Sequence, residues 1–223
     1  MGQRVEFPSN GHTCSGYFAA PANGKGPAVV VIQEWWGLVP HIEDLVERFA
    51  SAGFAAIAPD LYHGVTTRSP DDAMKLLMEL DVERACKEIE GAGAYVLGRE
   101  ELTSSKYGVV GFCMGGALAQ FAATRDRNVG AAVSFYGGFK KQPTEWDNLS
   151  APLLLIYAEN DRDLTAKGRE LAEKLKGMGK DVELHVYPNA EHAFFNDARP
   201  EVYDPEAAAD AWTRTIELFK RSL

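Results

Sequence analysis

The sequence predicts an α/β fold in which one open, mostly parallel sheet carries helices on both faces. Continuous apolar runs of five to eight residues recur along the chain, and amphipathic segments separate them. A parallel sheet that is buried on both faces needs such uninterrupted apolar strands. No repeat and no Pro/Ser-rich linker divides the 223 residues, so we expect a single domain over residues 1–223.

The predicted strands fall into three groups. Five apolar runs are expected to be central: Ala28–Gln33, Phe54–Pro59, Tyr107–Phe112, Gly130–Tyr136 and Pro152–Ala158. Val182–Tyr187 alternates apolar and polar residues, which is typical of a strand nearer an edge. The short segments Arg4–Phe7 and Gly16–Ala19 indicate an antiparallel hairpin, which mixed sheets often carry at one edge.

Helical periodicity fills the intervals between these runs. The predicted helices are Ile42–Ala52, Pro70–Leu97, Gly115–Arg125, Thr165–Met178 and Pro205–Arg221. Strands and helices therefore take turns along the chain. In an open sheet of this kind the ligand site lies at the carboxyl ends of the strands, so candidate functional residues are sought there.

Charge and composition exclude several classes of function. The 23 Lys and Arg against 32 Asp and Glu give a net charge of −9, which repels phosphate backbones and anionic lipids, so we expect no nucleic-acid or membrane partner. No window reaches the ~20 apolar residues of a bilayer span. The N-terminal segment lacks the apolar core of a signal peptide, so a cytoplasmic protein is expected. Cys14, Cys86 and Cys113 show no metal-type spacing, and we predict neither a metal site nor a disulfide.

One cysteine stands in a candidate nucleophile elbow. The segment Gly111-Phe112-Cys113-Met114-Gly115 follows a predicted strand and precedes a predicted helix, which matches the G-x-nucleophile-x-G pattern with Cys in place of Ser. Glycines two residues before and after the nucleophile let neighbouring backbones pass close to this strained turn. The helix N-terminus favours a thiolate at Cys113. The alternative is a buried cysteine in a tight turn.

A base and an acid follow in the chain order typical of α/β-hydrolases. Asp161 comes just after the strand that ends at Ala158, and His192 comes after the strand that ends at Tyr187. Only His192 among the five histidines lies both after the acid and past a strand end; the others are His12, His41, His63 and His185. Asp163 and Glu159 are alternative acids, and each acid could instead cap the helix that follows. His192 could also be an ordinary loop histidine.

Glu34 ends the most apolar strand and is the fourth candidate. A carboxylate there is costly unless it has a partner. Two interpretations stay open: a functional group at the catalytic edge, or a structural group that pairs with an Arg or caps a helix starting at Pro40. The topology places the backbone N–H of Trp35 beside that of Met114, which predicts an oxyanion hole made by these two groups.

Aromatic residues collect at or just past the strand ends. Trp36, Tyr62, Tyr136 and Phe194, with Trp35, could wall an apolar substrate pocket. The alternative for each of them is that it covers an edge of the core.

Several segments together form a recognisable set: Gln33-Glu34-Trp35-Trp36-Gly37, Ala58-Pro59-Asp60-Leu61-Tyr62, Gly111-Phe112-Cys113-Met114-Gly115-Gly116, Asp161 and His192-Ala193-Phe194. This set closely resembles the dienelactone hydrolase family, also called carboxymethylenebutenolidases, across nearly the whole chain. The resemblance implies an α/β-hydrolase fold with a catalytic triad of Cys113, His192 and Asp161. It also implies that Glu34 helps deprotonate the thiol when substrate arrives, and that the enzyme is cytosolic, cofactor-free and monomeric.

The sequence departs from this family at two substrate-binding positions. In members that open dienelactones, two arginines bind the substrate carboxylate: one lies one residue beyond the position of His63, and the other four residues beyond the catalytic His. This sequence has Gly64 and Asn196 there, which removes bidentate carboxylate recognition and puts dienelactone itself in doubt as the substrate. Arg68 and Arg199 lie nearby in sequence and are candidates to replace the missing arginines.

The predicted function is hydrolysis of an activated ester or lactone through Cys113 and a thioester intermediate. The expected partner is a small-molecule ester or lactone. Two alternatives remain. The chain could be a non-catalytic α/β-hydrolase-like module in which Cys113 is a redox sensor or a ligand-binding thiol. It could also be a carboxylesterase, thioesterase or cysteine peptidase of another substrate range.

Overall fold

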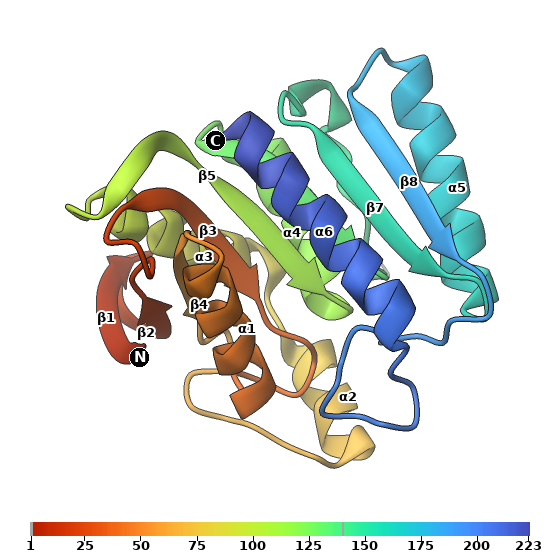
Figure 1. Cartoon of the computed structure of the whole chain (residues 1–223). Helices are drawn as coiled ribbons and strands as arrows, with labels where there is room; N and C mark the ends of the chain where they lie inside the picture. The colour runs from red at the N-terminus through yellow and green to blue at the C-terminus, as the bar shows by residue number, and fades with distance from the viewer. Residues whose placement is uncertain (1, 140) are drawn as a thin grey trace.

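One eight-stranded mixed sheet forms the centre of the computed structural model, which describes residues 2–139 and 141–223 (Figure 1). The strands are β1 (Gln3–Ser9), β2 (His12–Ala19), β3 (Gly26–Ile32), β4 (Ala55–Pro59), β5 (Leu102–Phe112), β6 (Val129–Phe135), β7 (Leu153–Ala158) and β8 (Val182–Tyr187). Their order is β1-β2-β4-β3-β5-β6-β7-β8. In this order, the six strands β4, β3, β5, β6, β7 and β8 pair in parallel. β2 pairs antiparallel with both β1 and β4. The predicted fold class is confirmed.

Helices cover both faces of this sheet. They are α1 (Pro40–Ser51), α2 (Pro70–Glu79), α3 (Val82–Leu97), α4 (Met114–Arg125), α5 (Arg162–Gly177) and α6 (Pro205–Ser222), with a 3₁₀ turn η1 (Trp146–Asn148). Figure 1 shows α6 crossing one face, which it shares with α1. Alternate residues of β3 face opposite layers: Val29 and Val31 pack with α1 and α6, whereas Val30 and Ile32 pack with α3 and α4. None of the helices in the described ranges is long and apolar enough to cross a bilayer.

The predicted helix Pro70–Leu97 is wrong as a single element. The chain breaks at Leu80, which is extended, and Asp81 caps α3 by accepting hydrogen bonds from the backbone N–H groups of Glu83 and Arg84 at 2.9 and 3.3 Å. The apolar periodicity continues across this break, so only the capping side chain marks it.

Two strand predictions are too short. β5 begins at Leu102 rather than at Tyr107, and the hairpin extends over Gln3–Ser9 and His12–Ala19. The early strands are longer than predicted because β2 pairs on both sides, with β1 and with β4. The hairpin therefore belongs to the main sheet.

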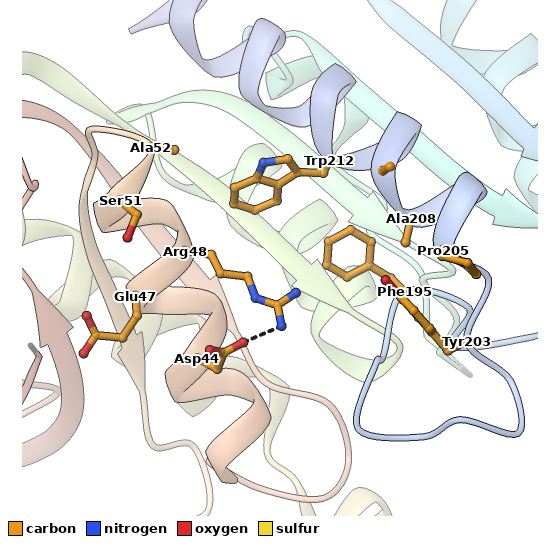
Figure 2. A pocket seen from close by; sticks show the side chains of 11 residues that line it. Asp44, Glu47, Arg48, Ser51, Ala52, Phe195, Tyr203, Pro205, Ala208 and Trp212 are labelled. Atoms are coloured by element: carbon orange, nitrogen blue, oxygen red, sulfur yellow. Dashed lines mark ion pairs between the residues drawn. The ribbon is translucent and has the colours of Figure 1, made fainter.

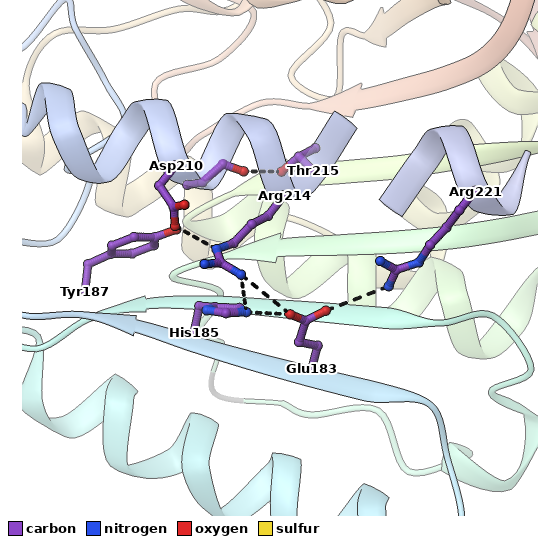
Figure 3. Close-up of polar contacts among 8 residues, drawn as sticks. Glu183, His185, Tyr187, Asp210, Arg214, Thr215 and Arg221 are labelled. Atoms are coloured by element: carbon purple, nitrogen blue, oxygen red, sulfur yellow. Dashed lines mark hydrogen bonds and ion pairs between the residues drawn. The ribbon is translucent and has the colours of Figure 1, made fainter. Parts of the chain in front are cut away.

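The edge position predicted for β8 is confirmed, and polar contacts tie this strand to α6 (Figure 3). His185 Nε2 lies 2.6 Å from a Glu183 oxygen, and Arg214 reaches the same imidazole nitrogen at 3.0 Å. The Tyr187 hydroxyl donates to Asp210 at 2.7 Å, and Arg214 Nε donates to the same carboxylate at 2.6 Å. These residues alternate along β8, which explains the polar half of its pattern and holds the segment that leads to residue 192.

Candidate active site

Cys113 occupies the sharp turn between β5 and α4. Its φ of 54° and ψ of −116° lie in a region that non-glycine residues rarely adopt. Its backbone N–H donates to the Phe135 carbonyl at 3.0 Å, which ties the turn to the end of β6. The side chain is partly exposed, whereas Cys14 and Cys86 are buried. The predicted strand–turn–helix arrangement around Cys113 is present.

Three glycines make room for this turn. A Cβ on Gly111 would lie 1.9 Å from the Gly115 carbonyl oxygen, and a Cβ on Gly115 would lie 2.5 Å from the Gln33 carbonyl oxygen. Gly116 is a third such position, because a Cβ there would lie 2.6 Å from the Phe135 carbonyl oxygen. The five-residue elbow pattern does not include it. These obstacles are backbone atoms, so they cannot be relieved by a rotamer change.

Gly115→Ala is therefore expected to destabilise the protein by at least ~3 kcal/mol, because backbone on β3 or α4 must move to admit the methyl group. Urea unfolding of the variant and of the wild-type protein measures the difference. Gly177→Ala is the matched control, because a Cβ at that helical position meets nothing within 4 Å. Unfolding curves of Gly115→Ala that coincide with those of the wild-type protein would contradict the packing at this turn.

His192 and Asp161 meet at the same sheet edge. His192 Nδ1 lies 2.5 Å from Asp161 Oδ2. Asp161 precedes α5 directly after β7, and His192 lies in the loop after β8. Of the alternative acids, Glu159 accepts from the Asn189 backbone N–H at 3.0 Å and Asp163 lies exposed in the first turn of α5. Because Nδ1 faces the carboxylate, Nε2 is left for the thiol and the substrate.

The surroundings of His192 stabilise its charged form. Burial alone lowers the pKa of His192, but the hydrogen bond with Asp161 and the interactions with the nearby Cys113 thiol, together with the charges of both groups, raise it to about 10. Three of the other histidines, His41, His63 and His185, lie beside carboxylates elsewhere in the fold. An imidazolium between an acid and a thiol is the arrangement that favours a thiolate at Cys113.

Glu34 is buried and has a neutral partner. The Asn196 side-chain amide donates to Glu34 Oε2 at 2.8 Å, and both side chains are almost fully buried. Burial raises the pKa of Glu34, while Asn196, His192 and Arg199 act in the opposite direction. The expected structural alternatives are wrong: within the described ranges no Arg forms an ion pair with Glu34, and α1 follows Val39 with no side-chain cap.

Sequence reasoning did not identify Asn196 as the partner of Glu34. Asn196 Oδ1 accepts from the Ala198 backbone N–H at 3.0 Å, which leaves the amide nitrogen facing Glu34. The only signal in the sequence is its spacing from His192. The next residue, Asp197, anchors this loop to α1 by an ion pair with Arg48 and by a polar contact with His41 at 3.3 Å.

A separate hollow lies on the α1 and α6 side of this loop (Figure 2). It has a volume of about 570 Å³, and Arg48, Phe195 and Trp212 contribute to its lining. It contains none of the four predicted catalytic residues. Phe195 stacks on Phe112 with ring centroids 5.4 Å apart, so the floor of the hollow is the aromatic packing behind the elbow.

The two predicted oxyanion donors lie at equivalent positions just after the neighbouring strands β3 and β5. Ile32 of β3 pairs with Gly111 of β5, and Trp35 and Met114 each follow three residues later. Met114 begins α4, which has no side-chain cap, so its first N–H groups are free of side-chain acceptors. In the described part of the chain, the Trp35 N–H also has no hydrogen-bond acceptor. The pair can therefore face a carbonyl oxygen above Cys113.

The predicted pocket aromatics differ in burial and in their contacts. Trp35 and Trp36 are half-buried, and their ring centroids lie 4.9 Å apart. Tyr62 donates to Met114 Sδ at 3.1 Å, and burial followed by the charge of Cys113 raises the pKa of its hydroxyl. Phe194 is 0% exposed and packs within the core, so it covers a core edge beneath His192.

Neither candidate replacement arginine approaches the site carboxylate as an ion pair. Arg199 binds Glu201 at 2.9 Å, and Arg68 is exposed. Across residues 2–139 and 141–223, no group of three or more His, Cys, Asp or Glu side chains could hold a metal ion. The chemistry available at this edge is therefore that of a thiol, an imidazole and two carboxyls beside two N–H donors.

Comparison with known proteins identifies relatives of this arrangement. Residues 14–223 match the model of the dienelactone hydrolase family. The chain is 40% identical over 231 residues to "Protein usf" of Aquifex pyrophilus, with 100% of both chains covered. It is 37% identical over 232 residues to an Aquifex aeolicus protein provisionally named a carboxymethylenebutenolidase, again with 100% of both covered. A crystal structure from Klebsiella pneumoniae, provisionally named a dienelactone hydrolase, has 29% identity and a TM-score of 0.87, covering 99% of this chain and 98% of that one.

Proposed function

The chain belongs to the dienelactone hydrolase family, and on this premise we propose that it hydrolyses activated esters or lactones with Cys113 as the nucleophile. The observation that supports the proposal is the contact of His192 Nδ1 with Asp161 at 2.5 Å, together with a His192 pKa of about 10 that both Asp161 and Cys113 help to raise. A redox or binding thiol does not need an acid that orients a base. The resemblance extends the proposal to a monomeric, cofactor-free, cytoplasmic enzyme with one catalytic domain.

The proposed reaction has two steps. The Cys113 thiolate attacks the carbonyl carbon, the Trp35 and Met114 N–H groups stabilise the oxyanion, and His192 protonates the departing oxygen as the thioester forms. A water that gives its proton to His192 then attacks the thioester and releases the acid and the thiolate. Asp161 holds the imidazole in the required tautomer and stabilises its charged form. Glu34 is proposed to act as a second base toward the thiol when substrate enters.

The nucleophile restricts the substrates. A thiolate leaves a tetrahedral adduct more readily than an alkoxide does, so the adduct reverts unless the substrate also has a good leaving group. Enol esters, aryl esters and enol lactones therefore suit this site better than amides or simple alkyl esters. This is an argument about leaving-group chemistry and does not depend on the shape of the pocket.

The charges around the site favour a neutral acyl group. Glu34 is held by an amide rather than by a guanidinium, and Arg199 is engaged by Glu201. Within the described ranges no guanidinium forms an ion pair with Glu34, so a substrate carboxylate there would meet a second carboxyl group, and desolvating it would be unfavourable. We propose that uncharged esters or lactones are preferred over a dienelactone that carries a carboxylate.

The proposal is tested by trapping the intermediate. Rapid mixing with p-nitrophenyl acetate and an acid quench is expected to yield an acetyl group on Cys113, detected by peptide mass spectrometry, with release of p-nitrophenolate ahead of steady turnover. The label should disappear on treatment with hydroxylamine, as a thioester does. Steady hydrolysis with the acetyl group on a hydroxyl, or labelling of Cys113 without turnover, would refute the mechanism, and the second outcome would favour the binding or redox module.

A further inference from the structure

The hydroxyl of Tyr136 is buried without a partner. Tyr136 is 1% exposed, and in the part of the chain that the structure describes its hydroxyl has no hydrogen-bond partner. Other buried tyrosines are satisfied: the Tyr107 hydroxyl donates to Asp126 at 2.6 Å, and the Tyr157 hydroxyl donates to the Gly137 carbonyl at 3.0 Å. An unsatisfied buried hydroxyl destabilises a fold, so its retention points to a partner that arrives with a ligand.

Tyr136 belongs to the catalytic edge. It directly follows β6, and its ring centroid lies 4.9 Å from that of His192. Its φ of 40° lies in the left-handed region, and its N–H donates to the Ile156 carbonyl at 2.6 Å. The carbonyl oxygen of the preceding residue, Phe135, accepts a hydrogen bond from the backbone N–H of Cys113. The strained backbone is therefore held between β7 and the elbow, which keeps the Tyr136 ring beside His192.

The charges of the site act on the Tyr136 hydroxyl. Burial raises the pKa of Tyr136 well above its usual value, and the charges of Glu34 and Cys113 raise it further. The hydroxyl therefore stays protonated and can serve as a donor throughout the neutral and alkaline range. Within the described residues, Glu34 accepts a hydrogen bond from Asn196 and none from this hydroxyl.

We propose that the Tyr136 hydroxyl donates a hydrogen bond to a second oxygen of the substrate, in the acyl group beside the scissile carbonyl. This inference rests on the proposed function and adds which acyl groups the site prefers. The carbonyl oxygen already has the Trp35 and Met114 N–H groups, and the departing oxygen has His192. The Tyr136 hydroxyl, as the remaining donor, then selects acyl groups that carry an ether, keto or similar oxygen over apolar acyl groups of the same shape. A site built to bind an oxygen discriminates strongly against an analogue that lacks it.

A pair of isosteric esters tests this inference. The methoxyacetate and butyrate esters of p-nitrophenol differ by one oxygen in place of a methylene group. We expect Tyr136→Phe to lower the methoxyacetate-to-butyrate ratio of kcat/KM by about tenfold or more relative to the wild-type protein, since one hydrogen bond is lost. Intrinsic differences in reactivity between the esters cancel in this comparison. The Tm of the variant should stay the same or rise, because the orphan hydroxyl is removed.

Tyr107→Phe is the matched control. It also removes a buried hydroxyl, but that hydroxyl is satisfied by Asp126 and lies six residues before the nucleophile on β5. This variant should lower the Tm and leave the ester ratio unchanged. An unchanged ratio in Tyr136→Phe, with both esters hydrolysed, would overturn this inference alone. Failure of the wild-type protein to hydrolyse either ester would overturn the proposed function and this inference with it.

Discussion

Cys113→Ala is expected to lower kcat/KM for p-nitrophenyl acetate by a factor of about 10⁴ or more, because the covalent route is lost and the oxyanion donors with bound water retain only a small residual rate. The substitution shortens a side chain that is already partly exposed, so it should leave the fold intact. Initial rates and circular dichroism of the variant and the wild-type protein provide the measurement.

Cys86→Ala is the control for this prediction. Cys86 is buried on α3, and burial raises the pKa of its thiol to about 11, so it should contribute nothing to turnover. Cys113→Ser places a weaker nucleophile on the same turn and should fall between the wild-type protein and the Ala variant. Equal rates for Cys113→Ala and the wild-type protein would assign the chemistry to another group.

The fold and the elbow could be predicted because both leave local marks in the sequence. Apolar strands, alternating helices and the glycines around Cys113 report constraints that act within a few residues. The contact between Glu34 and Asn196 joins residues 162 positions apart, and no local pattern carries it. The break at Leu80 cannot be predicted for a different reason: the apolar periodicity continues across it, and only the capping side chain of Asp81 marks it.

The neutral partner of Glu34 has a further consequence for the site. A guanidinium at position 196 would lower the pKa of Glu34 and offer a fork to a substrate carboxylate. The Asn196 amide carries no net charge, so it lowers the pKa of Glu34 only through its hydrogen bond and offers no fork. Burial therefore dominates, and the pKa of Glu34 is raised. The same exchange that weakens carboxylate binding thus leaves Glu34 with a raised pKa, which makes its ionised form a stronger base.

Asp161→Asn is expected to reduce kcat by about 10⁴-fold, because the amide no longer selects the tautomer in which His192 Nε2 faces the thiol. It should also lower the pKa of His192 from about 10 toward its ordinary value of 6.5, since the hydrogen bond and charge of Asp161 help to raise it. Because His192 then loses its proton at lower pH, the thiolate–imidazolium pair should be less populated at pH 8. The rate of Cys113 alkylation by iodoacetamide at that pH should fall, and NMR titration of His192 should show the lower midpoint.

The same linkage predicts how stability depends on pH. The pKa of His192 is about 10 in the folded protein and near 6.5 in the unfolded chain, so protonation of His192 stabilises the fold. This contribution is complete below pH 6.5 and is lost as the pH rises through about 10. The Tm difference between the wild-type protein and Asp161→Asn should therefore be larger at pH 6 than at pH 10. Asp163→Asn is the matched control, because Asp163 lies exposed two residues away in the first turn of α5 and should change neither kcat nor the His192 titration. If Asp163→Asn or Glu159→Gln reproduced the effects while Asp161→Asn did not, the acid of the proposed triad would have to be reassigned.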